Sequence, residues 1–107
     1  MYSIRYICMM IEIRETATFA DFIEDLADER AQAKISARIE RLAAGNAGDV
    51  AAVGEDVSEM RIHYGPGYRV YFASRGKTFI VLLCGGDKAT QSKDIKTAKL
   101  LARDLEW

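Results

Sequence analysis

Three strand-like segments joined by short turns, in the second half of the chain, most constrain the fold. Apolar side chains occupy alternate positions over residues 60–64 and again over residues 68–72, which is the period of a half-buried strand. A Gly-Pro-Gly turn at residues 65–67 separates these two segments, and an Arg-Gly-Lys turn at residues 75–77 follows them. Strands joined by such short turns must pair antiparallel. Residues 79–84 are apolar throughout, which predicts a central strand covered on both faces.

Helical patterns stand on both sides of these strands. Apolar residues recur at helical spacing over residues 19–26, with Thr18 as the expected N-cap, and again over residues 35–42 and 95–105. Residues 11–14 alternate apolar and charged side chains, as a strand does. The order strand, helix, helix, three strands, helix predicts an α+β domain of two layers, with the N-terminal helix hairpin packed on one face of an antiparallel sheet.

Length and composition fit one domain. The chain has 107 residues, half of them hydrophobic, and a formal net charge of -1, a balance that argues against disorder. No apolar run is long enough to span a bilayer, and the N-terminal apolar stretch makes a poor signal peptide. We therefore expect a cytoplasmic protein in which Cys8 and Cys84 stay reduced. Residues 45–54, with three glycines, are expected to form a loop.

Charge is distributed unevenly along the chain. Residues 1–57 carry 6 basic and 11 acidic groups, a net of -5, whereas residues 58–107 carry 9 basic and 5 acidic groups, a net of +4. A basic half favours a partner that carries phosphate. Chance variation in a small domain is the alternative explanation.

The predicted hairpin presents a polar face opposite its apolar one. Arg61, His63, Arg69 and Tyr71 alternate with the apolar positions, and Lys88 lies in the loop after the next strand. Guanidinium groups pair with phosphate oxygens, and aromatic rings stack on unpaired bases, so this set of side chains suits RNA. The sequence shows no obvious carboxylate opposite the two arginines, which favours an anion site. The same side chains would also form the solvated face of an antiparallel sheet.

Other kinds of site find less support in the sequence. Lys34, Arg38 and Arg41 share one face of the second helix, which is a solvated face or a phosphate contact. One histidine and two distant cysteines do not make a usual zinc site, so neither a metal nor another cofactor is expected. Residues 85–88, Gly-Gly-Asp-Lys, lack the spacing of a P-loop, and we expect the glycines to let the chain leave the edge of the sheet.

Four segments of the chain resemble a known family of proteins. Residues 45–49, 53–62, 64–72 and 82–88 are similar to the RelE/ParE toxin superfamily, above all to its addiction module killer protein branch, which is related to HigB-type toxins. The resemblance covers most of the chain from about residue 10, and residues 1–9 look like an N-terminal extension of a single toxin domain over residues 1–107. It implies a type II toxin with a small twisted antiparallel sheet and a cognate antitoxin, commonly a small helix-turn-helix protein.

Members of the superfamily act on different targets. RelE-like members cut mRNA on the ribosome without a metal, as endoribonucleases also called mRNA interferases. ParE-like members instead inhibit DNA gyrase. The resemblance to the nucleases places their catalytic arginine on Arg69 and their other basic residues on Arg61 and Lys88.

The expected mechanism follows from phosphoryl chemistry. A base removes the proton from a ribose 2′-OH, and that oxygen attacks the adjacent phosphorus in line while an acid protonates the departing 5′ oxygen. Arg61 and Arg69 stabilise the negative charge that develops. His63 is the only side chain that titrates near neutrality without help, so it is the candidate acid or base, with Lys88 and Asp94 behind it. The side chains expected to bind the RNA substrate are Tyr71, Arg38 and Lys34.

Two features leave alternatives open. The nucleases also use a Tyr or His near their C-terminal end, and residues 89–95 contain neither. A non-enzymatic gyrase inhibitor, or an inactive toxin that serves as an antitoxin-binding module, is therefore the alternative. The nuclease interpretation also requires Arg61 and Arg69 to lie on one side of the sheet, outside internal ion pairs. The antitoxin is expected on the basic hairpin face or on the N-terminal helix pair.

Overall fold

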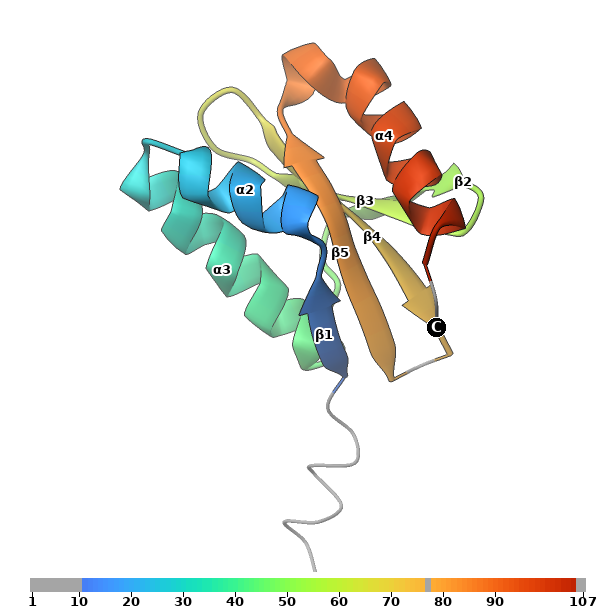
Figure 1. Ribbon diagram of the computed structural model, residues 1–107. Coiled ribbons are helices and arrows are strands. Elements are labelled where there is room, and N and C mark those ends of the chain that lie inside the picture. The colour runs from blue at the N-terminus through green and yellow to red at the C-terminus, as the bar shows by residue number, and fades with distance from the viewer. Residues whose placement is uncertain (1–10, 77, 106–107) are drawn as a thin grey trace, which may run out of the picture.

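A five-stranded sheet forms the middle of the molecule, with strands in the order β1-β5-β4-β3-β2 (Figure 1). The structure is a computed structural model, and it describes residues 11–76 and 78–105. The predicted N-terminal extension over residues 1–9, with Cys8, lies outside the described residues. The strands are β1 (Glu12–Glu15), β2 (Val50–Gly54), β3 (Val57–Ile62), β4 (Tyr68–Arg75) and β5 (Phe79–Gly86). The helices are α2 (Ala17–Asp25), α3 (Glu29–Ala43) and α4 (Gln91–Arg103), with a short 3-10 helix, η1 (Lys88–Thr90), before α4.

The predicted α+β class is confirmed, and the sheet is mixed rather than purely antiparallel. The β3–β4 and β4–β5 pairs are antiparallel, as their short turns require. β1 pairs in parallel with β5, because the chain passes through the helices and the other strands before it returns beside β1. β5 therefore lies between two neighbours, which confirms the central strand expected from its apolar run.

Two local predictions near the N-terminal half were wrong. The N-cap of α2 is Thr16 rather than Thr18, because the Thr16 hydroxyl both accepts a hydrogen bond from the Phe19 N–H and donates one to the Leu83 carbonyl. The expected loop over residues 45–54 contains the edge strand β2. Its turn to β3 is formed by Glu55 and Asp56, both at positive φ, which is the geometry of a two-residue hairpin turn.

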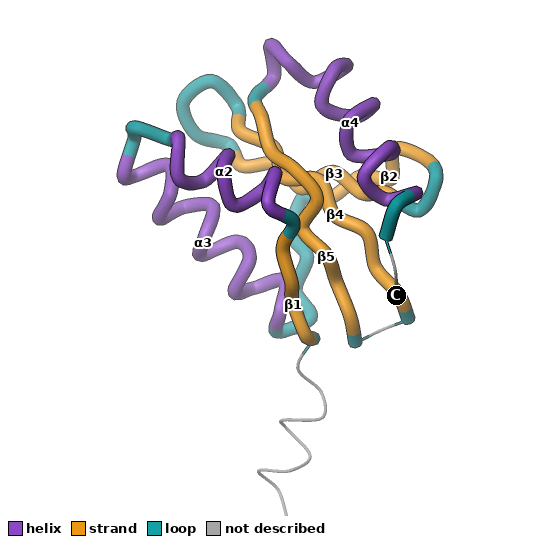
Figure 2. Tube along the Cα trace, viewed as in Figure 1, coloured by secondary structure: helices purple, strands orange, loops and turns teal. Residues whose placement is uncertain are grey.

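Helices cover both faces of the sheet, so the domain has three layers instead of the predicted two (Figure 2). On one face α2 and α3 enclose an apolar core that includes Phe19, Ile35, Met60 and Phe72. On the other face α4 packs through Ala98 against a second core, with the following strand residues: Val57, Tyr71, Ala73, Val81, Leu83 and Cys84. The face predicted to be open to RNA is thus partly covered by α4.

The two glycines at the end of β5 belong to the strand instead of releasing the chain from the sheet edge. β5 contains a bulge, since Tyr71 pairs with Cys84 and Phe72 pairs with Leu82. A side chain on Gly85 would overlap the Phe22 ring of α2, and one on Gly86 would overlap the Asp94 carboxylate of α4. The glycines therefore let helices approach the strand closely from both faces.

Candidate functional site

A buried carboxylate joins the two arginines that the sequence singled out. Arg61 on β3 and Arg69 on β4 lie directly opposite each other in the register. Glu59, two residues before Arg61, is fully buried. Its Oε1 lies 2.9 Å from Arg61 Nε, and its Oε2 lies 3.6 Å from Arg69 Nε. The arginines share one side of the sheet as expected, but the expectation that they lie outside internal ion pairs is wrong.

Two further groups complete this arrangement, which we call the Glu59 cluster: Glu59, Arg61, Arg69, Tyr71 and Gln91. The Tyr71 hydroxyl donates to Glu59 Oε2 at 3.0 Å, and the Gln91 amide at the start of α4 donates to the same oxygen at 2.9 Å. Burial acts to raise the pKa of the Glu59 carboxyl, but the hydrogen bonds and the arginine charge outweigh burial. The pKa therefore lies below its ordinary value, and the carboxylate stays charged.

Tyr71 does not bind RNA in the way that the sequence suggested. Its side chain is fully buried under α4, and its hydroxyl is bonded to Glu59. Burial and the hydrogen bond to the Glu59 carboxylate raise the pKa of the phenol, so it remains a neutral donor. A ring in this position cannot stack on a base, and its role is to hold Glu59 in place.

Among its own five members the cluster has one positive charge in excess, because two guanidinium groups surround one carboxylate. The Asp49 carboxylate outside the cluster also acts on Arg61, and Asp94 acts on Tyr71. Arg69 is nearly buried, with 13% of its side chain exposed, and its Nη1 donates to the Gly67 carbonyl at 2.9 Å. Arg61 is 39% exposed. Within residues 11–76 and 78–105, the only hydrogen bond from its guanidinium is the one from Nε to Glu59. The terminal nitrogens of Arg61 therefore form the accessible edge of the cluster.

Lys88 borders the same edge. It is exposed at the start of η1. Its Cβ and Arg69 Nη1 both lie 3.5 Å from the point that a Cβ on Gly67 would occupy. The three basic residues assigned by resemblance, Arg61, Arg69 and Lys88, are thus brought together at the end of the sheet beside the start of α4.

His63 lies in a different environment. Its Nε2 is 2.6 Å from Asp49 Oδ2, and its side chain is 76% exposed. It borders a shallow hollow of about 280 Å³ between α3 and the end of β3, which we call the α3 hollow. The residues that line this hollow are Lys34, Ala37, Arg38, Arg41, Ile62 and His63. The predicted substrate residues on the second helix therefore accompany His63 and not the arginine pair.

The two predicted substrate residues on α3 have different partners. The terminal nitrogens of Arg38 donate to the carbonyls of Arg61 and Ala47, so this guanidinium ties α3 to β3 and to the loop before β2. The Lys34 ammonium lies 5.2 Å from the centre of the Tyr64 ring, a cation–π distance. Lys34 is exposed and remains able to contact a polyanion, whereas Arg38 has a structural role.

The segment that lacks the expected Tyr or His supplies polar groups of another kind. Gln91 donates to Glu59. The Thr90 hydroxyl donates a hydrogen bond to the Asp94 carboxylate, which the sequence analysis had given as a further candidate for proton transfer after His63. Sequence reasoning missed both Glu59 and Gln91. The signal for Glu59 was its position two residues from Arg61 on the same face of one strand, while Gln91 offered none.

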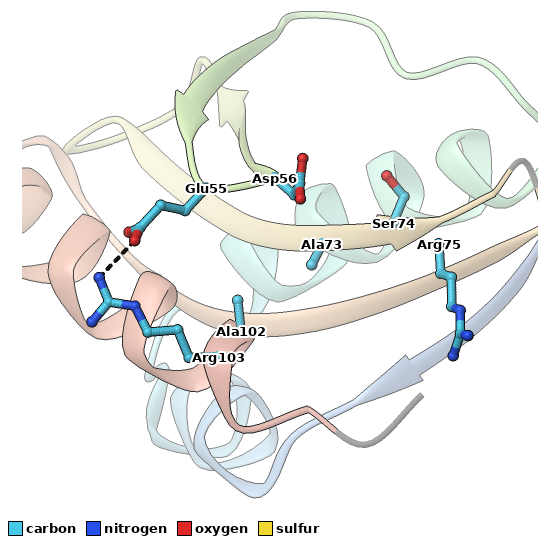
Figure 3. A pocket seen from close by; sticks show the side chains of 7 residues that line it. All are labelled: Glu55, Asp56, Ala73, Ser74, Arg75, Ala102 and Arg103. Carbon is cyan, nitrogen blue, oxygen red and sulfur yellow. Dashed lines mark hydrogen bonds and ion pairs between the residues drawn. The ribbon is translucent and has the colours of Figure 1, made fainter.

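Another hollow lies away from all of these residues. It has a volume of about 530 Å³ and is bordered by the β2–β3 turn, the end of β4 and the end of α4 (Figure 3). The Glu55–Arg103 ion pair, at 2.6 Å, crosses one side of it and ties the hairpin turn to α4 (Figure 3). No residue that the sequence analysis assigned to a site lines this hollow.

The part of the chain that the structure describes contains no group of three or more His, Cys, Asp or Glu side chains placed to hold a metal ion. Over the same residues, no helix has both the length and the apolar character needed to cross a membrane.

Comparison with known proteins adds a family and a fold. A family model described as "Phage derived protein Gp49-like (DUF891)" matches residues 21–105. An uncharacterized protein of Haemophilus influenzae is 52% identical over 97 residues, which is 91% of this chain and 98% of that protein. A mutant of the E. coli toxin RelE in the free state has a similar structure, with a TM-score of 0.70 over 91% of this chain and 100% of that one. At 10% identity this similarity shows the fold alone, and it confirms the expected RelE-like fold.

Proposed function

Because this chain belongs to the phage-derived Gp49-like (DUF891) family and has a RelE-like fold, we propose that it is the toxin of a type II toxin–antitoxin system. Within that class we propose a HigB-like endoribonuclease that cleaves mRNA on the ribosome. Its cognate antitoxin would be a small helix-turn-helix protein that binds and neutralises it. The excess positive charge of the Glu59 cluster beside Lys88 is the observation that supports a phosphodiester substrate.

The condition that the sequence analysis set for a nuclease, two arginines outside internal ion pairs, is not met, because both arginines pair with Glu59. The nuclease is proposed in a changed form, in which only the terminal nitrogens of Arg61 face the substrate, since its guanidinium bonds Glu59 through Nε alone among the described residues. The arginines cannot both turn the whole guanidinium toward one phosphate, because Arg61 Nε donates to Glu59 and Arg69 Nε is buried 3.6 Å from the same carboxylate. We assign charge stabilisation at the attacked phosphorus to the terminal nitrogens of Arg61, assisted by Lys88. Arg69 lies beneath them and contributes its charge through the buried network. A preorganised cation in such a position contributes on the order of 3 kcal/mol to the stabilisation of a developing oxyanion.

Proton transfer is assigned to His63. The imidazole is exposed, and the Asp49 carboxylate at 2.6 Å fixes its orientation. His63 lies just after the end of β3, where the Tyr64 N–H donates to the Ile62 carbonyl and turns the chain, and its side chain borders the α3 hollow. The proposal therefore requires one RNA strand to follow this turn, with a phosphate at the terminal nitrogens of Arg61, a ribose at the imidazole and a neighbouring phosphate at Lys34. The 2′ oxygen gives up its proton as it attacks phosphorus, the bond from phosphorus to the 5′ oxygen breaks, and that oxygen is protonated as it leaves.

Inducible expression in cells tests this function. Wild type should arrest growth and leave transcripts cut at defined positions, mapped by primer extension. Arg61→Ala and His63→Ala should each lower cleavage about a hundredfold. Glu55→Gln, an exposed change on the same hairpin, is the control and should arrest growth like wild type. Intact transcripts after induction of wild type would refute the nuclease.

A ParE-like gyrase inhibitor is the second candidate. It is favoured by the segment over residues 89–95, which has no Tyr or His and whose Gln91 amide is bonded to Glu59. In that case the same induction would produce a DNA-damage response while transcripts stay intact. Absence of arrest would instead indicate an inactive toxin that has kept only antitoxin binding.

A further inference from the structure

We propose that Glu59 is a positioning residue: it accepts a hydrogen bond from Arg61 Nε and lies at ion-pair distance from Arg69 Nε, so that the terminal nitrogens of Arg61 face a phosphodiester. The inference rests on the proposed function, since it concerns the same site. It adds a residue that neither the resemblance nor the charge pattern assigned. Four groups meet this one carboxylate, and they come from β3, β4 and α4.

The choice of nitrogen atoms is the first argument. A guanidinium carries five N–H donors, of which one is on Nε and four are on the terminal nitrogens. Both arginines approach Glu59 with Nε. The carboxylate therefore uses the inner edge of the Arg61 fork and leaves its outer edge, with both terminal nitrogens, for another anion. A carboxylate bound to the terminal nitrogens would have blocked that edge.

The register gives the second argument. Arg61 and Arg69 are directly opposite each other on antiparallel strands, where two like charges repel. A shared carboxylate offsets this repulsion and holds both side chains in one arrangement. Glu59 is in turn fixed by the Tyr71 hydroxyl and the Gln91 amide. Groups that act on a reacting atom need such support, because a displacement of about 1 Å costs much of their effect.

The burial of Glu59 indicates whether it positions Arg61 permanently or only occupies the phosphate site until RNA displaces it. A carboxylate that merely occupied the phosphate site in the absence of RNA would have to move out when RNA binds. Glu59 is fully buried, and its departure would leave the Tyr71 hydroxyl and the Gln91 amide without their acceptor. The structure therefore favours a carboxylate that stays in place while RNA meets the outer edge of Arg61.

Glutamine at position 59 is the sharpest test. The hydrogen-bond partners of the Glu59 carboxylate are all donors. In Glu59→Gln the amide oxygen still accepts from the donors on one side, but the amide NH₂ faces the donors on the other side and cannot accept from them. Glu59→Asp keeps the charge one methylene further from the arginines. Glu55→Gln makes the same change at an exposed position on the same hairpin and serves as the matched control. Thermal unfolding of each variant establishes that it is folded.

Two readouts distinguish this proposal from the proposed function. The first is cleavage of an RNA oligonucleotide on programmed ribosomes, with affinity measured separately on an oligonucleotide that has a 2′-deoxy sugar at the cleavage position. The second is the Nε–H signal of Arg61 in proton–nitrogen NMR spectra, assigned by its loss in Arg61→Lys. The NMR readout requires no catalysis, so it reports on Glu59 whether or not the protein cuts RNA.

In Glu59→Gln the cleavage rate at saturating RNA should fall at least tenfold, while affinity for the 2′-deoxy RNA changes less than threefold. Glu59→Asp should recover part of the cleavage rate. If Glu59→Gln does not fold, Glu59→Asp is compared with wild type in its place. The Arg61 signal should be resolved in wild type, shift when 2′-deoxy RNA is added, and collapse in Glu59→Gln. A wild-type rate, tighter RNA binding, or an unchanged Arg61 signal in Glu59→Gln would overturn the proposal. A wild type that shows the RNA-induced shift without cleavage would refute the nuclease and support positioning.

Discussion

The Glu59 cluster and the α3 hollow contain similar side chains and differ in how those side chains are held. In the cluster, a carboxylate with no exposed surface meets two guanidinium groups, a phenol and an amide. In the hollow, Lys34, Arg41 and His63 are exposed, and the Asp49 that pairs with His63 has 42% of its side chain exposed. One region fixes its charges through the core, and the other presents them to solvent.

The two regions are therefore suited to different tasks, because one holds its charged groups in fixed positions and the other leaves them free to move. Charges fixed by buried hydrogen bonds need no reorganisation when a substrate arrives, which is what stabilisation of a transition state requires. Exposed lysines and arginines on a helix keep their rotamer freedom and can follow a flexible phosphate backbone. We therefore expect the cluster to govern stability and the stabilisation of charge during catalysis. In the hollow, we expect the exposed lysine and arginine to govern the strength and salt dependence of RNA binding, and His63 to contribute proton transfer.

Removal of the buried carboxylate should have the largest effect. Glu59→Ala leaves Arg69, nearly buried, without its partner and directly opposite Arg61. Breaking a buried ion pair in this way costs about 3 kcal/mol of the free energy of unfolding. Urea denaturation followed by circular dichroism measures this loss. Glu55→Ala, which breaks the exposed pair with Arg103, should cost about 0.5 kcal/mol or less. Equal losses in the two variants would remove the distinction between buried and exposed charges.

Protonation of Glu59 at low pH should also lower the free energy of unfolding, by less than the Glu59→Ala substitution does. The pKa of Glu59 is lowered on folding from an ordinary value of 4.5, so its contribution is complete above that value. The contribution is lost as the pH falls from 4.5 through the lower pKa of the folded state. Wild type should therefore lose more stability than Glu59→Gln between pH 5 and pH 3 (roughly the range of carboxyl titration). Denaturation at several pH values measures both curves, and parallel curves would contradict the pKa shift.

Most of the fold was predictable, because it depends on patterns that adjacent residues share. Period two and short turns gave the antiparallel strands β3 and β4, and an unbroken apolar run gave the covered strand β5. The edge strand β2 was missed because its residues, Val-Ala-Ala-Val-Gly, are small and do not alternate. The third layer was missed because an amphipathic helix has the same pattern on either face of a sheet.

The site was less predictable, because its decisive contacts join residues distant in the sequence. The alternation of side chains along a strand placed Arg61 and Arg69 on one face of the sheet, and that placement was correct. The same alternation places Tyr71 on that face, but it does not reveal that α4 covers the side chain there. The partnership of Glu59 with Gln91, which lies 32 residues away in the sequence, depends on where α4 begins relative to β3.

In the α3 hollow, removal of single cations should change RNA binding more than stability. Lys34→Ala and Arg41→Ala should each make the plot of log affinity against log salt shallower by roughly 0.7 for single-stranded RNA. Both side chains are exposed, and both border the hollow. Fluorescence anisotropy with a 2′-deoxy-substituted oligonucleotide over several salt concentrations measures the slopes. Lys96→Ala, an equal change on the outer side of α4, is the control, and a matching slope change there would show general attraction in place of a binding surface.

The smallest effect on stability is expected from the ion pair that faces the same hollow. Asp49→Asn keeps the shape of the side chain and removes the charge beside His63. Water already solvates both partners, since 76% of His63 and 42% of Asp49 is exposed. The free energy of unfolding should therefore change by about 0.5 kcal/mol or less. If His63 transfers a proton, the same variant should still slow RNA cleavage, because the imidazole loses the group that orients it. A loss of stability as large as that of Glu59→Ala would show that the two regions are held alike.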